Sequence, residues 1–380
     1  MRRLVRGLVW LVAAVAALLI VVRTLFGGGA RLDDRTTAPI IGKSAIEQVA
    51  ALDYPPGNIA VSATGRVFLT LHPDGKPPIK VVELVDGKPV PFPDAAFQQP
   101  QSGTPHFQSP LSMRIDRQNR LWVLDYADYG RGQPRILAFD LDTRALVHQY
   151  DFPSEVAGFF SMLNDFAVSP DGTHVYIAES SPIRQTPALV VYDVTQRTSR
   201  RLLHKHPSVM PKNYVLNAAG RDMVVFGIYT LRIGVDSIAL DRTGKWLYYA
   251  PVNGDRMYRL PTAALDDVKL PPAVLASQVE DYGPKTMSDG LSSDDAGNLY
   301  ITDPEHSAVL TLGPDRRLTT LVKDEELRWP DGLSFGPDGW LYLTASSLQH
   351  VLFVPAGHQA AHAPYHVFRF KPGASAVAGH

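Results

Sequence analysis

The sequence predicts an all-β protein, a six-bladed β-propeller that follows an apolar N-terminal segment. Three observations predict it: a short phrase occurs six times, its spacing suits four-stranded blades, and an apolar run before the first copy has no partner there. Each copy consists of an apolar strand, a turn with Gly, Asp or Asn, and an aromatic-rich strand. The copies occupy residues 57–70, 111–125, 164–179, 236–250, 289–303 and 331–345.

The spacing of the copies gives the size of each blade. The turn residues on which the copies align are 54, 53, 72, 53 and 42 residues apart, and such lengths are typical of four short strands per repeat. Within each copy, apolar side chains alternate with small or polar ones, which indicates half-buried strands. The turn residues should have a positive φ, which glycine and asparagine adopt most easily. They are Gly65, Asn119, Gly172, Gly244, Gly297 and Gly339.

A propeller must join its first and last blades to remove open sheet edges. We therefore predict that the apolar run 45–52 forms the outer strand of the last blade. The expected organisation is a signal peptide or N-terminal anchor over 1–30, a linker over 31–42, the propeller over 43–372 and a frayed tail over 373–380.

The N-terminus has the layout of an export signal. Arg2, Arg3 and Arg6 precede the apolar run 8–22, so the rest of the chain should lie across the membrane, as a periplasmic, secreted or membrane-anchored protein. A cleaved signal and a short anchor both fit this length. The chain has no Cys, which excludes disulfides and thiol catalysis, and its net charge of -1 argues against nucleic acid as a partner. Membrane contact is expected only through the N-terminal segment.

The first residue of each inner strand should line the central channel on one face. These residues are Gly57, Leu111, Asn164, Asp236, Asp289 and Asp331, and Asp165 stands next to Asn164. Convergent carboxylates suit a hard cation such as Ca²⁺, and they suit an ammonium group equally well. The structural alternative is that Asp before a strand serves turn chemistry by bonding backbone amides.

Clustered carboxylates repel one another unless a positive charge accompanies them. Lys285 is a candidate for that charge, with an ordinary solvated lysine as the alternative, and Arg114 should tie blades together through a carboxylate. The widest spacing contains an insertion at 209–234, which we interpret as a lid or as a packing flap. As a lid it would offer Tyr214, Phe226 and Tyr229 as aromatic contacts to a ligand.

The histidines do not form a recognisable metal motif in the sequence. His358, His362 and His366 are spaced by four, but Pro364 interrupts the helix that this spacing would need, and we expect surface positions. The chain also contains no G-x-S-x-G elbow, P-loop or Rossmann fingerprint, so nothing in it supports nucleophilic hydrolysis.

Four segments, at 160–181, 188–193, 234–252 and 283–303, resemble the major royal jelly protein and insect yellow family. Bacterial members of that group are commonly labelled as related to dopachrome tautomerase. The resemblance implies a secreted six-bladed propeller. It implies less about a reaction, because the family includes pigment-pathway proteins, nutritive proteins and binders of small aromatic amines.

The chain is similar, more distantly, to gluconolactonase-type propellers. Their divalent metal is held by a Glu at the first blade and by Asn and Asp at later blades, where this chain has Asn164, Asp236 and Asp289. The chain departs from that pattern because Gly57, with Asn58 beside it, stands at the Glu position. Asp236 also replaces an Asn.

Three functions follow as hypotheses. The first is a propeller that binds a small amine or aromatic metabolite at Asn164, Asp165, Asp236, Lys285, Asp289, Asp331 and Tyr229, with Asp289 or Asp236 as proton acceptor if it acts as a tautomerase. The second is a metal-dependent lactonase that holds Ca²⁺ or another divalent cation at Asn164, Asp236 and Asp289. The third is a scaffold for another protein, and no cofactor is certain under any of them.

Overall fold

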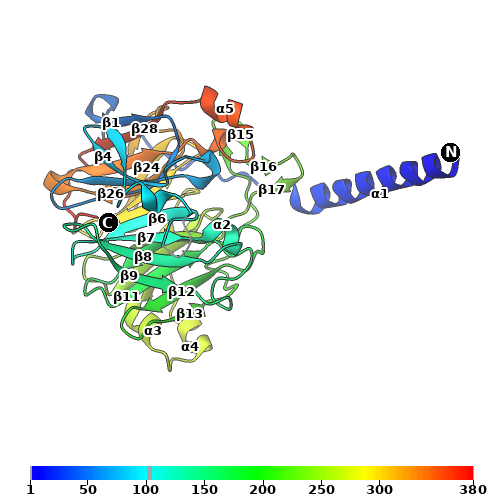
Figure 1. Cartoon of the computed structure of the whole chain (residues 1–380). Coiled ribbons are helices and arrows are strands. Elements are labelled where there is room, and N and C mark those ends of the chain that lie inside the picture. The colour runs from blue at the N-terminus through cyan, green and yellow to red at the C-terminus, as the bar shows by residue number, and fades with distance from the viewer. Residues whose placement is uncertain (1, 101–104, 380) are drawn as a thin grey trace.

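The computed structural model describes residues 2–100 and 105–379 and confirms the six-bladed β-propeller (Figure 1). Each blade is a four-stranded antiparallel sheet, and the inner strands of successive blades lie side by side around one channel. The first three blades are β2 to β5 (Pro56–Val61, Val67–Leu71, Val81–Val85, Lys88–Pro91), β6 to β9 (Pro110–Ile115, Arg120–Asp125, Arg135–Asp140, Leu146–Asp151) and β10 to β13 (Leu163–Val168, His174–Glu179, Ala188–Asp193, Thr198–Leu202).

The fourth and fifth blades continue the same pattern along the chain. They are β18 to β21 (Val235–Leu240, Trp246–Pro251, Arg256–Pro261, Glu280–Pro284) and β22 to β25 (Leu291–Ser293, Leu299–Asp303, Ala308–Leu312, Leu318–Lys323). The sixth blade combines the two ends of the propeller. It consists of β26 to β28 (Pro330–Phe335, Leu341–Ala345, Tyr365–Phe370) with β1 (Glu47–Leu52) as its outer strand. The pairing of β1 with β28 confirms the predicted closure of the ring.

The hairpin turns explain the repeated glycine. The five turn glycines and Asn119 all have a positive φ, between 59° and 86°, as the sequence predicted. The apolar core lies between neighbouring blades. In one such cluster, Phe68 of the first blade packs with Phe92, Phe107 and Phe139.

The inner strands begin with an irregularity that matters for the site. In five of the six blades the pairing between the first and second strands shifts near the start of the inner strand. Such a bulge bends the strand and redirects its side chains. The residues that the repeat aligns at this point lie at or beside these irregularities.

The insertion at 209–234 forms two small hairpins between the third and fourth blades. They are β14–β15 (Asn217–Ala218, Arg221–Asp222) and β16–β17 (Val224–Val225, Tyr229–Thr230). The helices after α1 are short and lie in loops. They are α2 (Ala127–Gly130), α3 (Thr262–Asp266), α4 (Pro272–Ser277) and α5 (Ala356–Ala361), with 3₁₀ turns η1 (Lys43–Ala45), η2 (Pro73–Gly75), η3 (Ala96–Gln98), η4 (Pro337–Gly339) and η5 (Leu348–His350).

Both chain ends are attached to the propeller more closely than the sequence suggested. The helix α1 (Arg2–Phe26) projects away from the side that carries α2, α5 and the insertion, and the residues after it pack on the propeller (Figure 1). The prediction of a frayed tail is wrong for residues 373–379. Ser375 accepts a backbone hydrogen bond from Asp295, and Gly379 bonds to both Ile115 and Phe335, so the tail crosses several blades.

Candidate functional site

One pocket opens at the end of the channel where the inner strands begin. Its enclosed volume is about 60 Å³, and the space rises to about 700 Å³ when the open mouth is included. The predicted residues Asn164, Asp165, Asp236, Asp289 and Asp331 all line it. The repeat phase therefore brings together five side chains that span 168 positions of the chain.

Asp236, Asp289 and Asp331, here called the acid floor, come from three consecutive blades. Burial is the main cause that raises the pKa of all three carboxyls. Their mutual repulsion adds to this rise at Asp236 and Asp331, and burial raises the pKa of Asp289 to about 6. The floor therefore favours bound protons or a bound cation.

The hydrogen bonds of the acid floor argue against the turn-chemistry alternative. The Asn164 amide donates to Asp236 (2.6 Å), the Trp329 indole to Asp289 (2.6 Å) and the Ser346 hydroxyl to Asp331 (2.8 Å). These carboxylates thus bond side chains at the channel instead of their own backbone amides. Each keeps further lone pairs that a ligand can use.

The glycine after two of these aspartates has a packing role. A Cβ on Gly290 would lie 1.8 Å from the carbonyl oxygen of Asp331, and one on Gly332 would lie 2.9 Å from the Cα of Asn58. Adjacent inner strands approach too closely here for any side chain. The Asp-Gly pairs therefore combine a site residue with a contact between blades.

Asp165 lines the pocket, but both of its oxygens are already engaged. The Arg114 guanidinium lies 3.1 Å from one oxygen, and the Asn58 amide donates to the other (2.8 Å). Arg114 also donates to the Asn58 amide oxygen (2.5 Å). This buried arrangement joins the first three blades, as predicted for Arg114, and pairs the Asp165 carboxylate. Asp165 still adds to the raised pKa values of the acid floor, and Arg114 lowers the pKa of Asp331.

Lys285 is fully buried and is not among the residues that line the pocket. Its ammonium group donates to the Thr286 carbonyl (2.8 Å), the Ser288 hydroxyl (3.1 Å) and the Val252 carbonyl (3.4 Å). Burial lowers its pKa to about 7. Its positive charge lowers the pKa of Asp289, but burial has the larger effect and raises it. Lys285 therefore affects the acid floor only through its charge, without lining the pocket.

The insertion reaches the pocket, although through other residues than predicted. Leu231 and Ile233 line the wall, whereas Tyr229 lies outside it, with its hydroxyl on the Pro182 carbonyl (3.3 Å) and its ring beside Phe26. Phe226 is 81 % exposed. The lid interpretation thus gains an aliphatic wall from the segment between β17 and β18.

Sequence reasoning missed the apolar half of the pocket. Leu348, Leu352 and Phe353 follow the second strand of the last blade, and Trp329 precedes its first strand. Trp329 stands two residues before the repeat-aligned Asp331, and this spacing could have predicted that it lies at the pocket. Leu111 lines the wall from the repeat-aligned position on β6. Met162, Pro182 and Tyr129 also line it, and they come from connecting segments that follow no repeat.

These features define a class of protein: a six-bladed propeller with an acidic, apolar-walled pocket at one end of its channel. The family model described as "Major royal jelly protein" matches residues 108–353, more than half of the chain. The chain therefore belongs to the major royal jelly protein family, which confirms the resemblance noted in its sequence.

Two relatives from the honeybee, Apis mellifera, show how distant the relationship is. Major royal jelly protein 3 is 28% identical over 214 residues, which cover 52% of this chain and 37% of the relative. Major royal jelly protein 1 is 30% identical over 218 residues, which cover 52% of this chain and 48% of the relative. The matched region thus spans less than half the length of either relative.

Among solved structures, a gluconolactonase from Xanthomonas campestris is similar in fold. The TM-score is 0.53 at 13% sequence identity, and the match covers 86% of this chain and 88% of the gluconolactonase. This likeness confirms the propeller architecture that the distant resemblance implied. At this identity it concerns the fold alone.

Proposed function

We propose that this chain is an extracytoplasmic, membrane-anchored propeller that binds a small organic ammonium compound with an apolar or aromatic body. The observation that supports the proposal is the acid floor of Asp236, Asp289 and Asp331 beneath apolar walls. Burying like charges together is unfavourable unless a cation or protons accompany them. The nearby Arg114 is committed to Asp165, which leaves the floor for a positive group from the ligand.

The walls favour an organic cation over a bare metal ion. Leu231, Ile233, Leu348 and Trp329 surround the space above the carboxylates. Burial of an apolar body against these side chains would contribute roughly 25 cal/mol for each Å² removed from water.

Proton transfer within the pocket is the reaction for which the site is best equipped. Burial raises the pKa of Asp289 to about 6, a value suited to a general base at neutral pH. Asp289 would take a proton from one atom of the bound ligand and return it to another, and Asp236 and Asp289 together would attract the ammonium group. We propose tautomerase-like activity on this basis.

The metal-dependent lactonase fits these residues less well. Asn164, Asp236 and Asp289 provide oxygen donors of the kind that Ca²⁺ prefers. At the first blade, however, Gly57 has no side chain, and the oxygen of neighbouring Asn58 accepts a hydrogen bond from Arg114. The first-blade ligand is missing and a guanidinium lies close to its place, so we derive no step through a metal.

The location outside the cytoplasm rests on α1. Residues Arg3–Phe26 form an exposed helix with a mean hydropathy of 2.6, long and apolar enough to span a membrane. The arginines at its start favour a cytoplasmic N-terminus and a propeller on the other side. A signal sequence passes the same test of length and composition.

The segment after α1 favours an anchor over a cleaved signal. Ala30 pairs with Tyr214 in a parallel bridge, and the carbonyl of Gly28 accepts hydrogen bonds from Thr230 and Arg232. Further along, Arg35 donates to the carbonyls of Asp255 and Lys285, both at 2.8 Å. Cleavage near Gly28 or Ala30 would remove contacts that hold this segment on the insertion.

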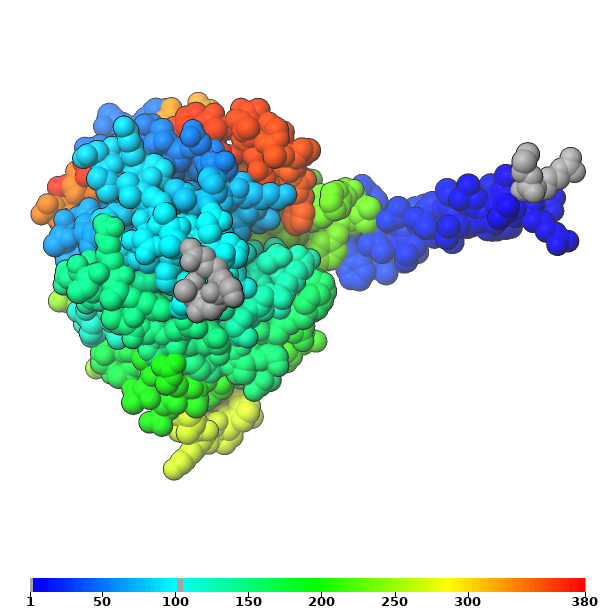
Figure 2. All heavy atoms as spheres, in the orientation of Figure 1, coloured from blue at the N-terminus to red at the C-terminus, as the bar shows by residue number. Residues whose placement is uncertain are grey.

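We infer that the anchor holds the pocket mouth toward the membrane, which extends the expected membrane contact beyond the N-terminal segment. Figure 2 shows α1 emerging next to the insertion and α5, which belong to the pocket side of the propeller. Loops on this side expose Phe159, Ile183, Phe226 and Phe353, and Phe353 also lines the pocket. We infer that these side chains contact the bilayer surface and that ligands enter from the membrane interface.

Binding to the full-length chain in detergent tests the ligand class. We would titrate phenethylamine, its uncharged analogue phenethyl alcohol, and Ca²⁺, and follow the heat of binding by calorimetry. We expect the amine to bind at least tenfold more tightly than the alcohol, because a charge-assisted hydrogen bond contributes about 1.5–3 kcal/mol.

Matched variants separate the outcomes of this titration. Asp289→Asn should weaken amine binding at least tenfold, whereas Asp53→Asn, a change at an exposed carboxylate, should leave it unchanged. Ca²⁺ binding that is lost in Asp289→Asn would favour the lactonase. Equal affinity for amine and alcohol would refute an ammonium site, and no binding of any probe would favour a protein scaffold.

A further inference from the structure

Three histidines that lie apart in the sequence meet beside the pocket. His350 is the last residue of η5, His358 lies in α5, and His362 follows the end of α5. One ring nitrogen from each lies within 4.8 Å of the other two. The sequence pattern pointed to His366 as the third member, but the loop before α5 brings His350 there instead.

The separation of two of these nitrogens matches that of two ligands on one metal ion. His350 Nδ1 and His358 Nε2 are 3.2 Å apart. Two imidazole ligands at about 2.0–2.1 Å from a tetrahedral ion would have nitrogens about 3.3 Å apart. The His362 nitrogen lies within 4.8 Å of both, and its ring stacks on His350 with the ring centroids 3.7 Å apart.

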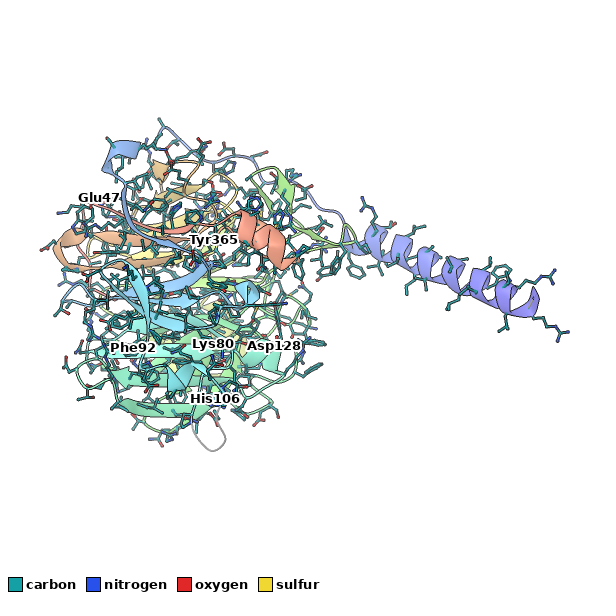
Figure 3. The ribbon with its side chains drawn as sticks, turned by 45° about the horizontal axis from the view of Figure 1, so that its top comes forward. Glu47, Lys80, Phe92, His106, Asp128 and Tyr365 are labelled. Atoms are coloured by element: carbon teal, nitrogen blue, oxygen red, sulfur yellow. The ribbon has the colours of Figure 1, made fainter. Side chains whose placement is uncertain are left out.

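A hydrogen bond orients the His362 ring within the cluster. His362 Nδ1 lies 2.8 Å from the carbonyl oxygen of His358, to which it can only donate, so its Nε2 keeps a free lone pair. Metal-bound histidines usually donate their second nitrogen in this way. Gln359 donates to the carbonyls of Asp74 and Val351 and accepts from the Tyr365 hydroxyl, so α5 is fastened to the propeller beside Tyr365 (Figure 3).

The charges near the cluster limit its affinity for a cation. Arg328 and Arg221 donate to the carbonyls of His362, Pro364, Gln349 and Leu352, and their positive charge opposes a second cation.

We propose that His350, His358 and His362 bind one divalent transition metal ion of the Zn²⁺, Cu²⁺ or Ni²⁺ class. Imidazole nitrogens select these ions, whereas Ca²⁺ and Mg²⁺ require oxygen ligands. The fourth position is open to water or to an exogenous ligand. This site is separate from the acid floor and does not depend on the proposed amine binding.

The metal would stabilise one wall of the pocket. The segment that carries His350 also contributes Leu348, Leu352 and Phe353 to that wall. Joining η5 to α5 through a shared ion would restrict this segment without touching the carboxylates. The site therefore has a structural role at the pocket mouth.

The test uses the full-length chain in detergent, purified without a histidine tag and stripped of metal. Co²⁺ binding is followed by visible absorption, and Zn²⁺ binding by calorimetry and by the shift in unfolding temperature. We expect one equivalent of Zn²⁺, competition with Co²⁺, and no competition by Ca²⁺. Co²⁺ bands typical of imidazole ligands should appear and then disappear as Zn²⁺ is added.

Single substitutions assign the ligands. His350→Ala and His362→Ala should each weaken Zn²⁺ binding at least tenfold and abolish the thermal shift. His366→Ala, a nearby histidine on β28, and Asp236→Asn on the acid floor should bind as the unmodified chain does. If His350→Ala fails to fold, His358→Ala provides the same test, because the His358 side chain is exposed.

Two results would overturn the proposal. One is binding of less than half an equivalent of every ion of the class, and the other is undiminished binding in the His350 and His362 variants. If the histidine variants still bind the metal and Asp236→Asn does not, the metal binds at the acid floor.

Discussion

Replacing Asp289 by Asn should make the ligand-free protein more stable while it weakens ligand binding. The pKa of this carboxyl is about 6 in the folded chain, against an ordinary value of 3.8, mainly because it is buried. The change corresponds to about 3 kcal/mol by which the ionised form destabilises the folded state. We reduce this to about 2 kcal/mol because Asp289 is partly open to the pocket.

The sign of the effect follows from proton binding. Below pH 3.8 the carboxyl is protonated in both the folded and the unfolded chain, so it has no influence on stability. As the pH rises from about 4 to 6, the unfolded chain loses this proton first and the folded state becomes relatively less stable. Above pH 6 the full penalty is present. Asn carries no charge and avoids it, and it can still accept the Trp329 hydrogen bond.

Thermal unfolding of the full-length chain at pH 4.5, 6.0 and 7.5 measures the effect. The entropy of unfolding of a domain of this size is about 0.7 kcal/mol per kelvin, so 2 kcal/mol corresponds to roughly 3 °C. We expect Asp289→Asn to unfold about 3 °C higher than the unmodified chain at pH 7.5 and only about 1 °C higher at pH 4.5, where about a third of the penalty is present.

The exposed Asp53→Asn serves as the control and should not change the unfolding temperature. A less stable Asp289→Asn at pH 7.5 would refute the reasoning, since the carboxylate would then stabilise the fold. A gain of equal size at every pH would also refute it, because the gain would not come from ionisation.

Three further predictions concern the blades and the membrane face. Arg114→Met leaves a buried carboxylate unpaired and should destabilise the chain by about 3–5 kcal/mol in urea unfolding; a loss below 1 kcal/mol would contradict the buried ion pair. Gly290→Ala should lower stability by about 2–3 kcal/mol, because its Cβ meets the backbone of the next blade, whereas Gly357→Ala in α5 meets nothing and should be neutral. In bilayers, Phe226→Trp should be quenched by brominated lipids and Val268→Trp, an exposed control near α3, should not; equal quenching would argue against a membrane-facing pocket.

The sequence by itself determined the architecture of this protein. The period-two strands, the turn residues with positive φ and the unpartnered run before the first copy each follow from local backbone geometry, and together they specify six closed blades. The repeat phase also predicted Asn164, Asp236, Asp289 and Asp331 as neighbours, because equivalent residues of a closed ring must surround the same axis. Arg114 as a link between blades followed from the penalty for burying an unpaired charge.

Tertiary structure alone decided what surrounds those carboxylates. Leu231, Leu352 and the partner histidines of His350 lie in loops that follow no repeat, so only the packing of one blade loop against another determines their positions. The same holds for Tyr229, which packs on Phe26 and not in the pocket, and for the tail, whose Gly379 bonds to two inner strands. Local periodicity sets which way a strand residue points, whereas the place of a loop residue depends on contacts with segments far away in the chain.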